Sequence, residues 1–167
     1  EAQVINYTWA ITLSFMAVPI LKQRLKTADY MAAAACYFGV LYIATRGQIG
    51  SLEFSNVSGV AFALLSTIIW ALYWLLNTKD KRPSLVGLTL NFVFALPIVF
   101  IYAALTGELT HWDNDGLWGA VYIGLFEMGL SFVFWNKALK LTSNASQVAN
   151  LIFLSPLLSI VWLSQFA

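Results

Sequence analysis

Charged residues are scarce in this sequence. Lysine, arginine, aspartate and glutamate together make up 10% of its 167 residues, whereas 60% are hydrophobic and 16% are aromatic. An ordinary soluble domain contains about 25% charged residues, so this chain lacks the polar side chains needed to cover a surface in water. The composition therefore predicts an integral membrane protein. The net charge of +1 provides no basic surface for a nucleic-acid partner.

Residue types and motifs that carry catalysis or metal binding are also missing. The chain has one cysteine, Cys36, and one histidine, His111, which excludes a disulfide framework and a cysteine–histidine zinc site. It has no glycine-rich phosphate-binding loop, no Gly-x-Ser-x-Gly or His-Glu-x-x-His sequence, and no pair of intramembrane carboxylates. We therefore predict neither an ATP-driven pump nor an enzyme, and we expect no cofactor and no metal.

Long apolar runs dominate what is present. A membrane-spanning helix needs roughly 20 mainly apolar residues, and six runs fit this requirement. They are Val4–Leu21, Ala28–Thr45, Val57–Leu76, Leu85–Leu105, Gly116–Trp135 and Ala145–Phe166. The first run is the weakest of the six because it contains several polar residues. The predicted fold class is all-α, a polytopic bundle of transmembrane helices. Because residue 1 is Glu rather than Met, we expect the chain to be part of a longer protein.

The connections between these runs alternate in charge. Lysine and arginine number three after the first run, one after the second, three after the third, none after the fourth and two after the fifth. Basic connections lie on the cytoplasmic side of a membrane by the positive-inside rule. The first, third and fifth connections are therefore predicted to be cytoplasmic, which leaves both ends of the chain on the outer side of the cell membrane.

A short sequence near the start of the chain returns near its end. Ala2–Asn6 reads Ala-Gln-Val-Ile-Asn, and Ser146–Asn150 reads Ser-Gln-Val-Ala-Asn. In the predicted topology the first segment enters the membrane from outside and the second from the cytoplasm. Similar segments that run in opposite directions are typical of the inverted repeats of secondary transporters, whose substrate site lies near mid-membrane. Chance similarity between two polar helix starts is the alternative.

Glu127 is the one acidic residue deep inside a predicted span. A charge at the bilayer centre costs at least ~2.5–3.5 kcal/mol, so such residues usually face a water-filled cavity or a partner. We interpret Glu127 as a site for a proton or a cation. The alternative is a structural hydrogen bond from the protonated acid to a neighbouring helix. At α-helical spacing Glu127 shares one face with four small or polar residues, Gly116, Ala120, Gly124 and Ser131.

Aromatic and amide side chains in other runs extend the candidate site. Asn6 and Tyr7 lie near the outer third of the first run, and Asn150 is the deepest amide of the last run. Trp70 lies deep enough in its span to line a cavity. Trp74 lies nearer the end of the same span, which is typical of an anchor at the membrane interface.

Pro156 interrupts the last apolar run. Because proline has no backbone N–H, it should bend the helix just beyond Asn150. The bend is either purely structural or a gate or hinge beside the polar start of this helix.

Five stretches carry a family resemblance, namely Ala2–Trp9, Ala32–Gly47, Ile68–Trp74, Trp135–Leu139 and Ala145–Leu158. In order and spacing they resemble EamA-type permeases of the drug/metabolite transporter superfamily, whose members have ten helices in two five-helix inverted repeats. The resemblance implies that the six runs correspond to helices four to nine. Residues 1–46 would end the first repeat, and residues 47–167 would form the second repeat without its last helix. One departure is Gln23, which stands where the family commonly has Glu.

These features, with the resemblance, predict a secondary transporter that moves small organic metabolites such as amino acids by alternating access. The resemblance implies export more often than import. The expected partners are a small-molecule substrate and the lipid bilayer. Five residues are predicted to bind the substrate at a mid-membrane site, namely Asn6, Tyr7, Trp70, Glu127 and Asn150. Glu127 is also the predicted coupling residue, and Pro156 the predicted gate or kink. The alternative is a non-transporting membrane scaffold or partner subunit that uses the same helices for association.

Overall fold

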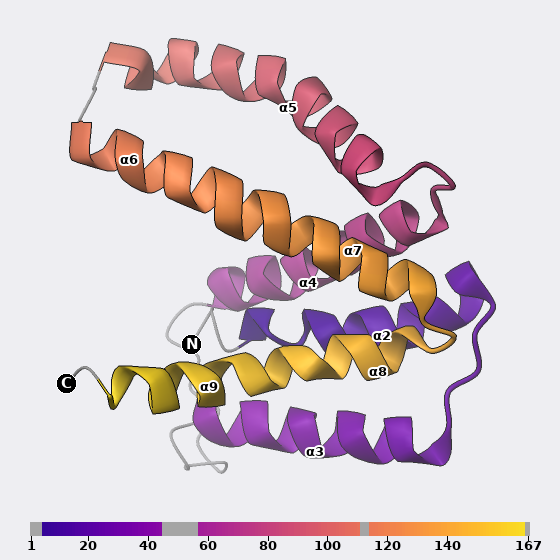
Figure 1. Cartoon of the computed structure of the whole chain (residues 1–167). Helices are drawn as coiled ribbons and strands as arrows, with labels where there is room; N and C mark the ends of the chain where they lie inside the picture. The colour runs from indigo at the N-terminus through magenta and orange to yellow at the C-terminus, as the bar shows by residue number, and fades with distance from the viewer. Residues whose placement is uncertain (1–4, 45–56, 111–113, 166–167) are drawn as a thin grey trace. The chain divides into compact units, whose positions relative to one another are not determined.

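A computed structural model describes residues 5–44, 57–110 and 114–165, and in these ranges the chain forms helices joined by short connections and no strand (Figure 1). The predicted all-α class is confirmed for this part of the chain. The chain divides into two compact units, of which one contains residues 1–76 and 142–167 and the other contains residues 77–141.

Three helical stretches among the described residues are long and apolar enough to cross a membrane. They are Ser58–Lys79, Ser84–Thr106 and Gly116–Leu141, and they correspond to the third, fourth and fifth predicted spans. The other three predicted spans differ from this pattern. The first is a helix of 13 residues, the second is a helix of 18 residues, and the sixth is divided into three helical segments.

The first unit is built from helices at both ends of the chain. It contains α2 (Trp9–Leu21), α3 (Thr27–Ala44), most of α4 (Val57–Lys79), α8 (Ala145–Asn150), the 3-10 helix η3 (Leu151–Phe153) and α9 (Leu154–Leu163). The main contact joins α8 to α2, and α8 also touches α3 (Figure 1). Segments more than 120 residues apart in the sequence, such as Gln23 and Ala145, therefore lie side by side.

Small side chains bring α2 and α8 close together. Ala10, Ser14 and Ala17 recur at i, i+4 and i+7 on α2, and all three are buried. On α8, Ala145 and Ala149 are completely buried. Lipid is as apolar as these helices, so their association depends on van der Waals packing between closely approaching backbones. This alanine-rich seam supplies that packing.

Polar contacts fix the direction of α8 relative to α2. The backbone N–H of Ala145 donates to Gln23 Oε1 at 2.8 Å, and Asn144 Nδ2 donates to Asp29 Oδ2 at 3.1 Å. Asn144 also caps α8, because its Oδ1 accepts a hydrogen bond from the backbone N–H of Ser146 at 3.0 Å. The start of α8 therefore lies at the end of α2, and the two helices run antiparallel. Gln23 provides the acceptor at a position where the EamA-type pattern commonly has a carboxylate.

These bonds join two connections, residues 22–26 and 142–144, at one end of the first unit. Charge counting assigns the first and fifth connections to the same side of the membrane, and their contact agrees with that assignment. Which side they face stays a prediction. Ala2–Val4, the first part of the repeated sequence, lie outside the described residues, so the inverted repeat also stays a prediction.

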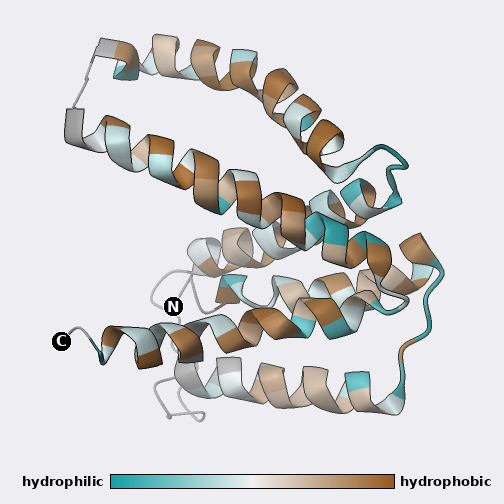
Figure 2. Ribbon diagram, viewed as in Figure 1, coloured by the Kyte–Doolittle hydropathy of each residue, from teal (hydrophilic) through white to brown (hydrophobic). Residues whose placement is uncertain are grey.

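The second unit begins with the last turn of α4 and consists mainly of two long apolar stretches. It contains α5 (Ser84–Thr106), the 3-10 turn η1 (Glu108–Thr110), α6 (Asn114–Tyr122), the π-helix η2 (Ile123–Ser131) and α7 (Phe132–Leu141). α5 ends at Gly107, whose φ of 79° lets its N–H donate to the carbonyl of Ala103. Hydrophobic residues run along α5 and the α6–α7 stretch, and hydrophilic residues gather at the connection before α5 (Figure 2).

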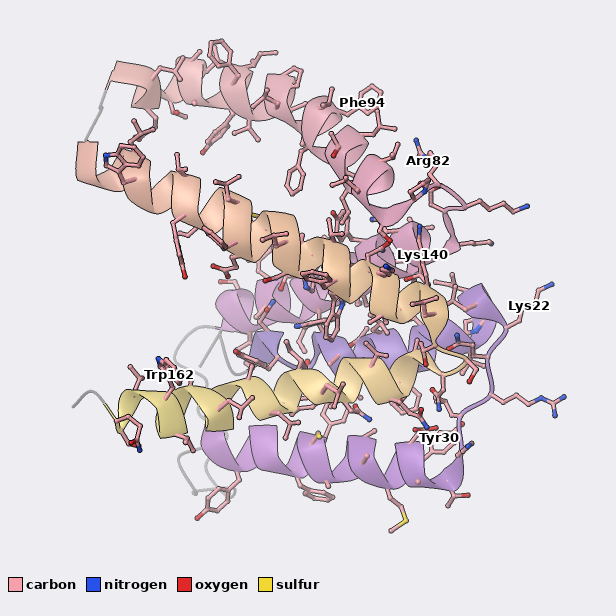
Figure 3. The ribbon with its side chains drawn as sticks, in the orientation of Figure 1. Lys22, Tyr30, Arg82, Phe94, Lys140 and Trp162 are labelled. Atoms are coloured by element: carbon pink, nitrogen blue, oxygen red, sulfur yellow. The ribbon has the colours of Figure 1, made fainter. Side chains whose placement is uncertain are left out.

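Arg82 organises the polar end of the second unit (Figure 3). Its Nη2 lies 2.6 Å from Asp80 Oδ2, and its carbonyl accepts a hydrogen bond from Lys140 Nζ at 2.7 Å. The hydrogen bonds from the Arg82 side chain lower the pKa of Asp80 to about 2, so this carboxylate is charged at neutral pH. These contacts join the third connection to the end of α7, where the basic residues were also predicted to be cytoplasmic.

Candidate solute-binding site

A cavity of about 380 Å³ lies in the first unit. Asn6, Ser66, Ile69 and Trp70 line it. Pockets for small molecules begin at roughly 300 Å³, so the cavity has the volume for a small organic solute. Two of the five predicted binding residues, Asn6 and Trp70, meet here although they are far apart in the sequence.

A short chain of hydrogen bonds orients Asn6. Its Nδ2 donates to Ser66 Oγ at 2.7 Å, and the Ser66 hydroxyl donates to the carbonyl of Ala63 at 2.7 Å. A second polar contact joins the same two segments, where Thr12 Oγ1 lies 3.4 Å from Thr67 Oγ1. Asn6 Oδ1 accepts no hydrogen bond from any described residue. This oxygen is therefore available to accept an N–H or O–H group of a solute.

Trp70 forms a rigid wall of the cavity because three aromatic rings surround it. Its ring stacks on Tyr73 with centroids 5.4 Å apart and an interplanar angle of 13°. It meets Trp9 and Trp74 edge to face, at 6.4 Å and 5.7 Å. Such pairs are favourable ring arrangements and restrict the side chain to one orientation.

The same cluster corrects the interpretation of Trp74. An interfacial anchor should be exposed at the membrane surface, but Trp74 is only 2% exposed. Its ring packs edge to face against both Trp70 and Tyr73. The predicted anchor role is therefore wrong, because Trp74 packs against the neighbouring rings in the core of the first unit.

Tyr7 and Asn150 do not line this cavity. Tyr7 is half-buried in the turn before α2, and Asn150 is half-buried as the last residue of α8. The Nδ2 of Asn150 lies 3.4 Å from Ser146 Oγ within its own helix. Their part in solute binding stays a prediction.

The helix type changes immediately after Asn150. α8 gives way to the 3-10 helix η3, and α9 then begins at Leu154. Pro156 has no N–H to donate to the carbonyl of Ile152, four residues earlier. The hydroxyl of Ser155 donates to that carbonyl instead, at 2.8 Å. The helix is thus irregular where a bend was predicted, and the role of Pro156 as a gate stays a prediction.

Glu127 belongs to the second unit, at the middle of the π-helix η2. The residue is exposed, and its carboxylate has no hydrogen-bond or ion-pair partner among the described residues. The face predicted for it is wrong beyond Tyr122, where the α-helical spacing ends. Because a π-helical turn takes more residues than an α-helical turn, Gly124 and Glu127 do not overlie each other as α-helical spacing implied.

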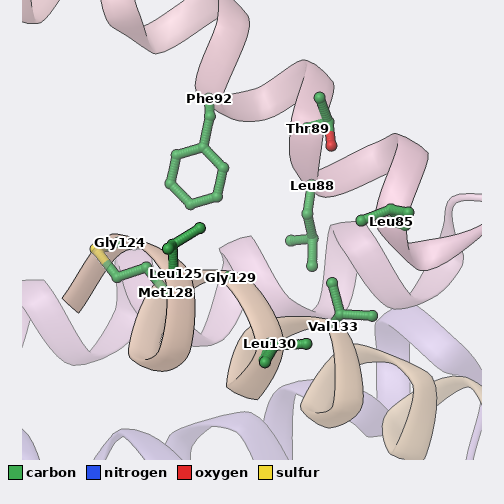
Figure 4. Close-up of a pocket in the computed structure, with 10 residues that line it drawn as sticks. All are labelled: Leu85, Leu88, Thr89, Phe92, Gly124, Leu125, Met128, Gly129, Leu130 and Val133. Carbon is green, nitrogen blue, oxygen red and sulfur yellow. The ribbon is translucent and has the colours of Figure 1, made fainter. Parts of the chain in front are cut away.

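A second cavity, of about 430 Å³, lies between α5 and η2 within the second unit (Figure 4). Phe92 and Leu88 of α5 line it opposite Leu125 and Met128 of η2. Thr89 contributes the one polar side chain of its described lining, and Glu127 is not part of it. This space is lined almost entirely by apolar side chains, and its described lining has no amide like that of Asn6 in the first cavity.

Sequence reasoning missed Asn136. This side chain is 1% exposed, and its Nδ2 has no hydrogen-bond partner in the described part of the chain. The available signal was its position three residues before Leu139, which places an amide on the buried face of α7. Asn91, by contrast, has the structural partner that the sequence suggested. Its Nδ2 donates to Asn77 Oδ1 at 2.7 Å, and this hydrogen bond joins α5 to the end of α4.

Comparison with known families decides the class of the protein. The model of the EamA-like transporter family matches residues 57–166, which are 110 of the 167 residues. The chain belongs to the EamA-like transporter family. The matched region of this EamA-like chain starts at α4 and includes Ser66, Trp70 and Glu127.

Two curated relatives of the EamA-like chain are also named as transporters. The uncharacterized transporter YyaM of Bacillus subtilis (strain 168) is 25% identical over 134 residues, which cover 76% of this chain and 44% of the relative. An uncharacterized transporter of Clostridium kluyveri is 23% identical over 166 residues, which cover 96% of this chain and 53% of the relative. The chain thus spans about half the length of the curated relatives it matches. No solved structure gives a significant match.

Family membership and the apolar helices together identify an integral multi-pass membrane protein. The family is one of transporters, which move solutes rather than convert them.

Proposed function

We propose that the protein containing this EamA-like chain is a secondary transporter that exports small organic metabolites, amino acids among them, by alternating access. The observation that carries the proposal is the cavity in which Asn6, Ser66 and Trp70 meet, within a chain of a transporter family. Secondary transporters bind their substrates near mid-membrane, between their repeats.

The chemistry of this cavity suits a small solute with a nitrogen group. Asn6 Oδ1 can accept a hydrogen bond from an amine or an amide of the solute. The indole of Trp70 offers a flat apolar surface, and its face also attracts a cationic ammonium group. Tyr7 and Asn150 extend the polar lining in this proposal, while Glu127 binds the proton or cation that couples transport to an ion gradient.

The proposed topology places the six helical regions as helices four to nine of a ten-helix inverted-repeat transporter in the cell membrane. The division into residues 1–46 and 47–167 follows from this placement. Hydrogen bonds within each unit support it, since they join basic connections that charge counting assigns to the cytoplasm. Antiparallel packing of α2 and α8 is also the arrangement that two inverted segments require.

A scaffold or partner subunit is the second candidate function. Gly116 and Ala120 lie four residues apart on α6 and are both exposed. Small residues at this spacing allow two membrane helices to approach closely, so this stripe favours association. The first unit favours transport instead, because its own small-residue seam is buried within the unit and the unit also contains a cavity with polar lining residues.

Replacing Trp70 tests the transport proposal. In the full-length protein, Trp70→Ala is expected to raise the KM for the transported solute at least ~10-fold, equivalent to about 1.4 kcal/mol of binding free energy. The loss follows from removing the wall of the cavity. Initial rates of solute counterflow in proteoliposomes give the KM.

Two further variants serve as controls for Trp70→Ala. Trp70→Phe keeps an aromatic ring and should raise the KM less than the alanine variant. Phe94→Ala removes a ring that is 73% exposed on α5 and should leave the KM unchanged (Figure 3). A Trp70→Ala variant with the wild-type KM would remove this cavity from the transport pathway.

A further inference from the structure

The helix that carries Glu127 is not α-helical around this residue. η2 is a π-helix of nine residues, Ile123–Ser131, set between α6 and α7. π-Helical segments are rare, are mostly a single turn long, and are frequent at functional sites. Glu127 lies at the middle of this one, with four π-helical residues on each side.

Gly129 permits the π-helical turn before it. A Cβ atom at position 129 would lie 2.9 Å from the carbonyl oxygen of Gly124, five residues earlier. That contact is with backbone, which cannot swing away as a flexible side chain can. A side chain at position 129 would therefore force this turn to open. At Gly124 itself a Cβ would meet nothing within 4 Å.

Ser131 supports the next π-helical turn. Its hydroxyl donates to the carbonyl of Phe126 at 2.8 Å, again five residues earlier. In an α-helix a serine hydroxyl bonds back to the carbonyl three or four residues earlier. Both five-residue turns, 124–129 and 126–131, contain Glu127, so the local sequence favours the π-helical form where the acidic residue lies.

The helix type determines where the carboxylate of Glu127 points. Each residue of an α-helix advances about 100° around the axis, and a π-helical residue advances less. A return to α-helical form would therefore rotate Glu127 relative to at least one of the flanking helices. No described residue bonds the carboxylate, so within the second unit the backbone determines from which side of the helix this side chain projects. Glu127 is also the one acidic residue in the three candidate spans.

We propose that η2 is a positioning device for Glu127, in which Gly129 and Ser131 are the positioning residues. They keep the segment π-helical and so hold the carboxylate at one angle about the helix axis, the angle at which it takes up the coupling proton or cation. The α-helical form places the carboxylate at a different angle relative to the flanking helices. This inference rests on the proposed function for the coupling role of Glu127, but the geometry of η2 can be tested independently of transport.

The test compares four variants of the full-length protein. Gly129→Ala introduces the Cβ that opens the first turn, and Ser131→Ala removes the hydroxyl from the second. Ser131→Thr retains a hydroxyl and should restore wild-type behaviour. Gly124→Ala is the matched control, because it makes the same chemical change in the same π-helix where a Cβ has open space.

Two measurements are made on each variant. The first is the titration midpoint of the Glu127 carboxyl, observed by carbon-13 NMR as the signal absent from a Glu127→Gln sample. The second is the pH profile of solute transport in proteoliposomes. Gly129→Ala is expected to move the midpoint by at least ~1 pH unit, a tenfold change in proton affinity, and to move the transport profile in the same direction. Ser131→Ala should give a smaller shift of the same sign, while Ser131→Thr and Gly124→Ala should match the wild type.

The outcomes separate this inference from the proposed function. If the wild type transports no solute but Gly129→Ala still moves the midpoint, the proposed function fails and the positioning role stands. If transport occurs and both Gly129→Ala and Ser131→Ala titrate like the wild type, the positioning role is overturned. If Gly129→Ala does not fold, the titration midpoints of Ser131→Ala and Ser131→Thr are compared instead. Midpoints of both variants equal to that of the wild type overturn the proposal.

Discussion

Full-length protein carrying Glu127→Gln is expected to transport at least ~10-fold more slowly than the wild type, and the dependence of its rate on pH should be lost. The amide cannot take up or release a proton, so it cannot couple proton movement to solute movement. The tenfold loss corresponds to about 1.4 kcal/mol. Initial transport rates in proteoliposomes, measured as a function of pH, give both quantities.

Glu108→Gln is the matched control for this experiment. It makes the same carboxyl-to-amide change in the turn η1, outside the three candidate spans. Its rate and pH profile should equal those of the wild type. A Glu127→Gln variant with normal pH-dependent transport would remove Glu127 from the coupling mechanism, and the structural hydrogen bond would then be the better interpretation of this residue.

The second large effect is expected at the seam between α2 and α8. Ala149→Leu adds three carbon atoms where the native side chain is completely buried. Overpacking of this kind typically costs ~1–3 kcal/mol, and it should lower the temperature of thermal unfolding in detergent micelles by several degrees. Intrinsic tryptophan fluorescence during heating reports this temperature.

Gln147→Leu controls for adding a leucine to the same helix. Gln147 is exposed on α8, so an apolar side chain of similar size there meets no neighbour that must move. This variant should unfold within about one degree of the wild type, because surface substitutions usually change stability by less than ~0.5 kcal/mol. Equal unfolding temperatures for Ala149→Leu and the wild type would show that the seam is not tightly packed.

Much of the secondary structure could be predicted from the sequence because it depends on composition over long stretches. Length and hydropathy alone identified three spans, namely Val57–Leu76, Leu85–Leu105 and Gly116–Trp135. At most ends the helices of the structure extend only a few residues beyond these predicted bounds. Asn6 and Trp70, two of the five predicted binding residues, line one cavity, and their role in solute binding stays a prediction.

Other features of the structure could not be predicted, because they depend on contacts that the spacing of residues in the sequence does not reveal. Gly129 permits the π-helix because a Cβ there would lie 2.9 Å from the Gly124 carbonyl oxygen. The sequence prediction assumed α-helical spacing throughout and therefore misplaced the face of Glu127. Trp74 is buried by its neighbouring rings, although its position near a helix end indicated an anchor. The bond between Gln23 and Ala145 joins residues 122 positions apart, which no local pattern reveals.

The central claim is that Trp70 and Asn150 border a solute pathway. Its most direct test is chemical labelling in the full-length protein after all native cysteines, Cys36 among them, have been replaced by alanine. Trp70→Cys and Asn150→Cys then report access to water through their reaction with a membrane-impermeant maleimide, and Phe94→Cys on the exposed apolar surface of α5 is the protected control. A transport pathway predicts that both positions react and that the transported solute slows both reactions. Complete protection of both positions, equal to that of residue 94, would contradict the pathway and favour the packed scaffold.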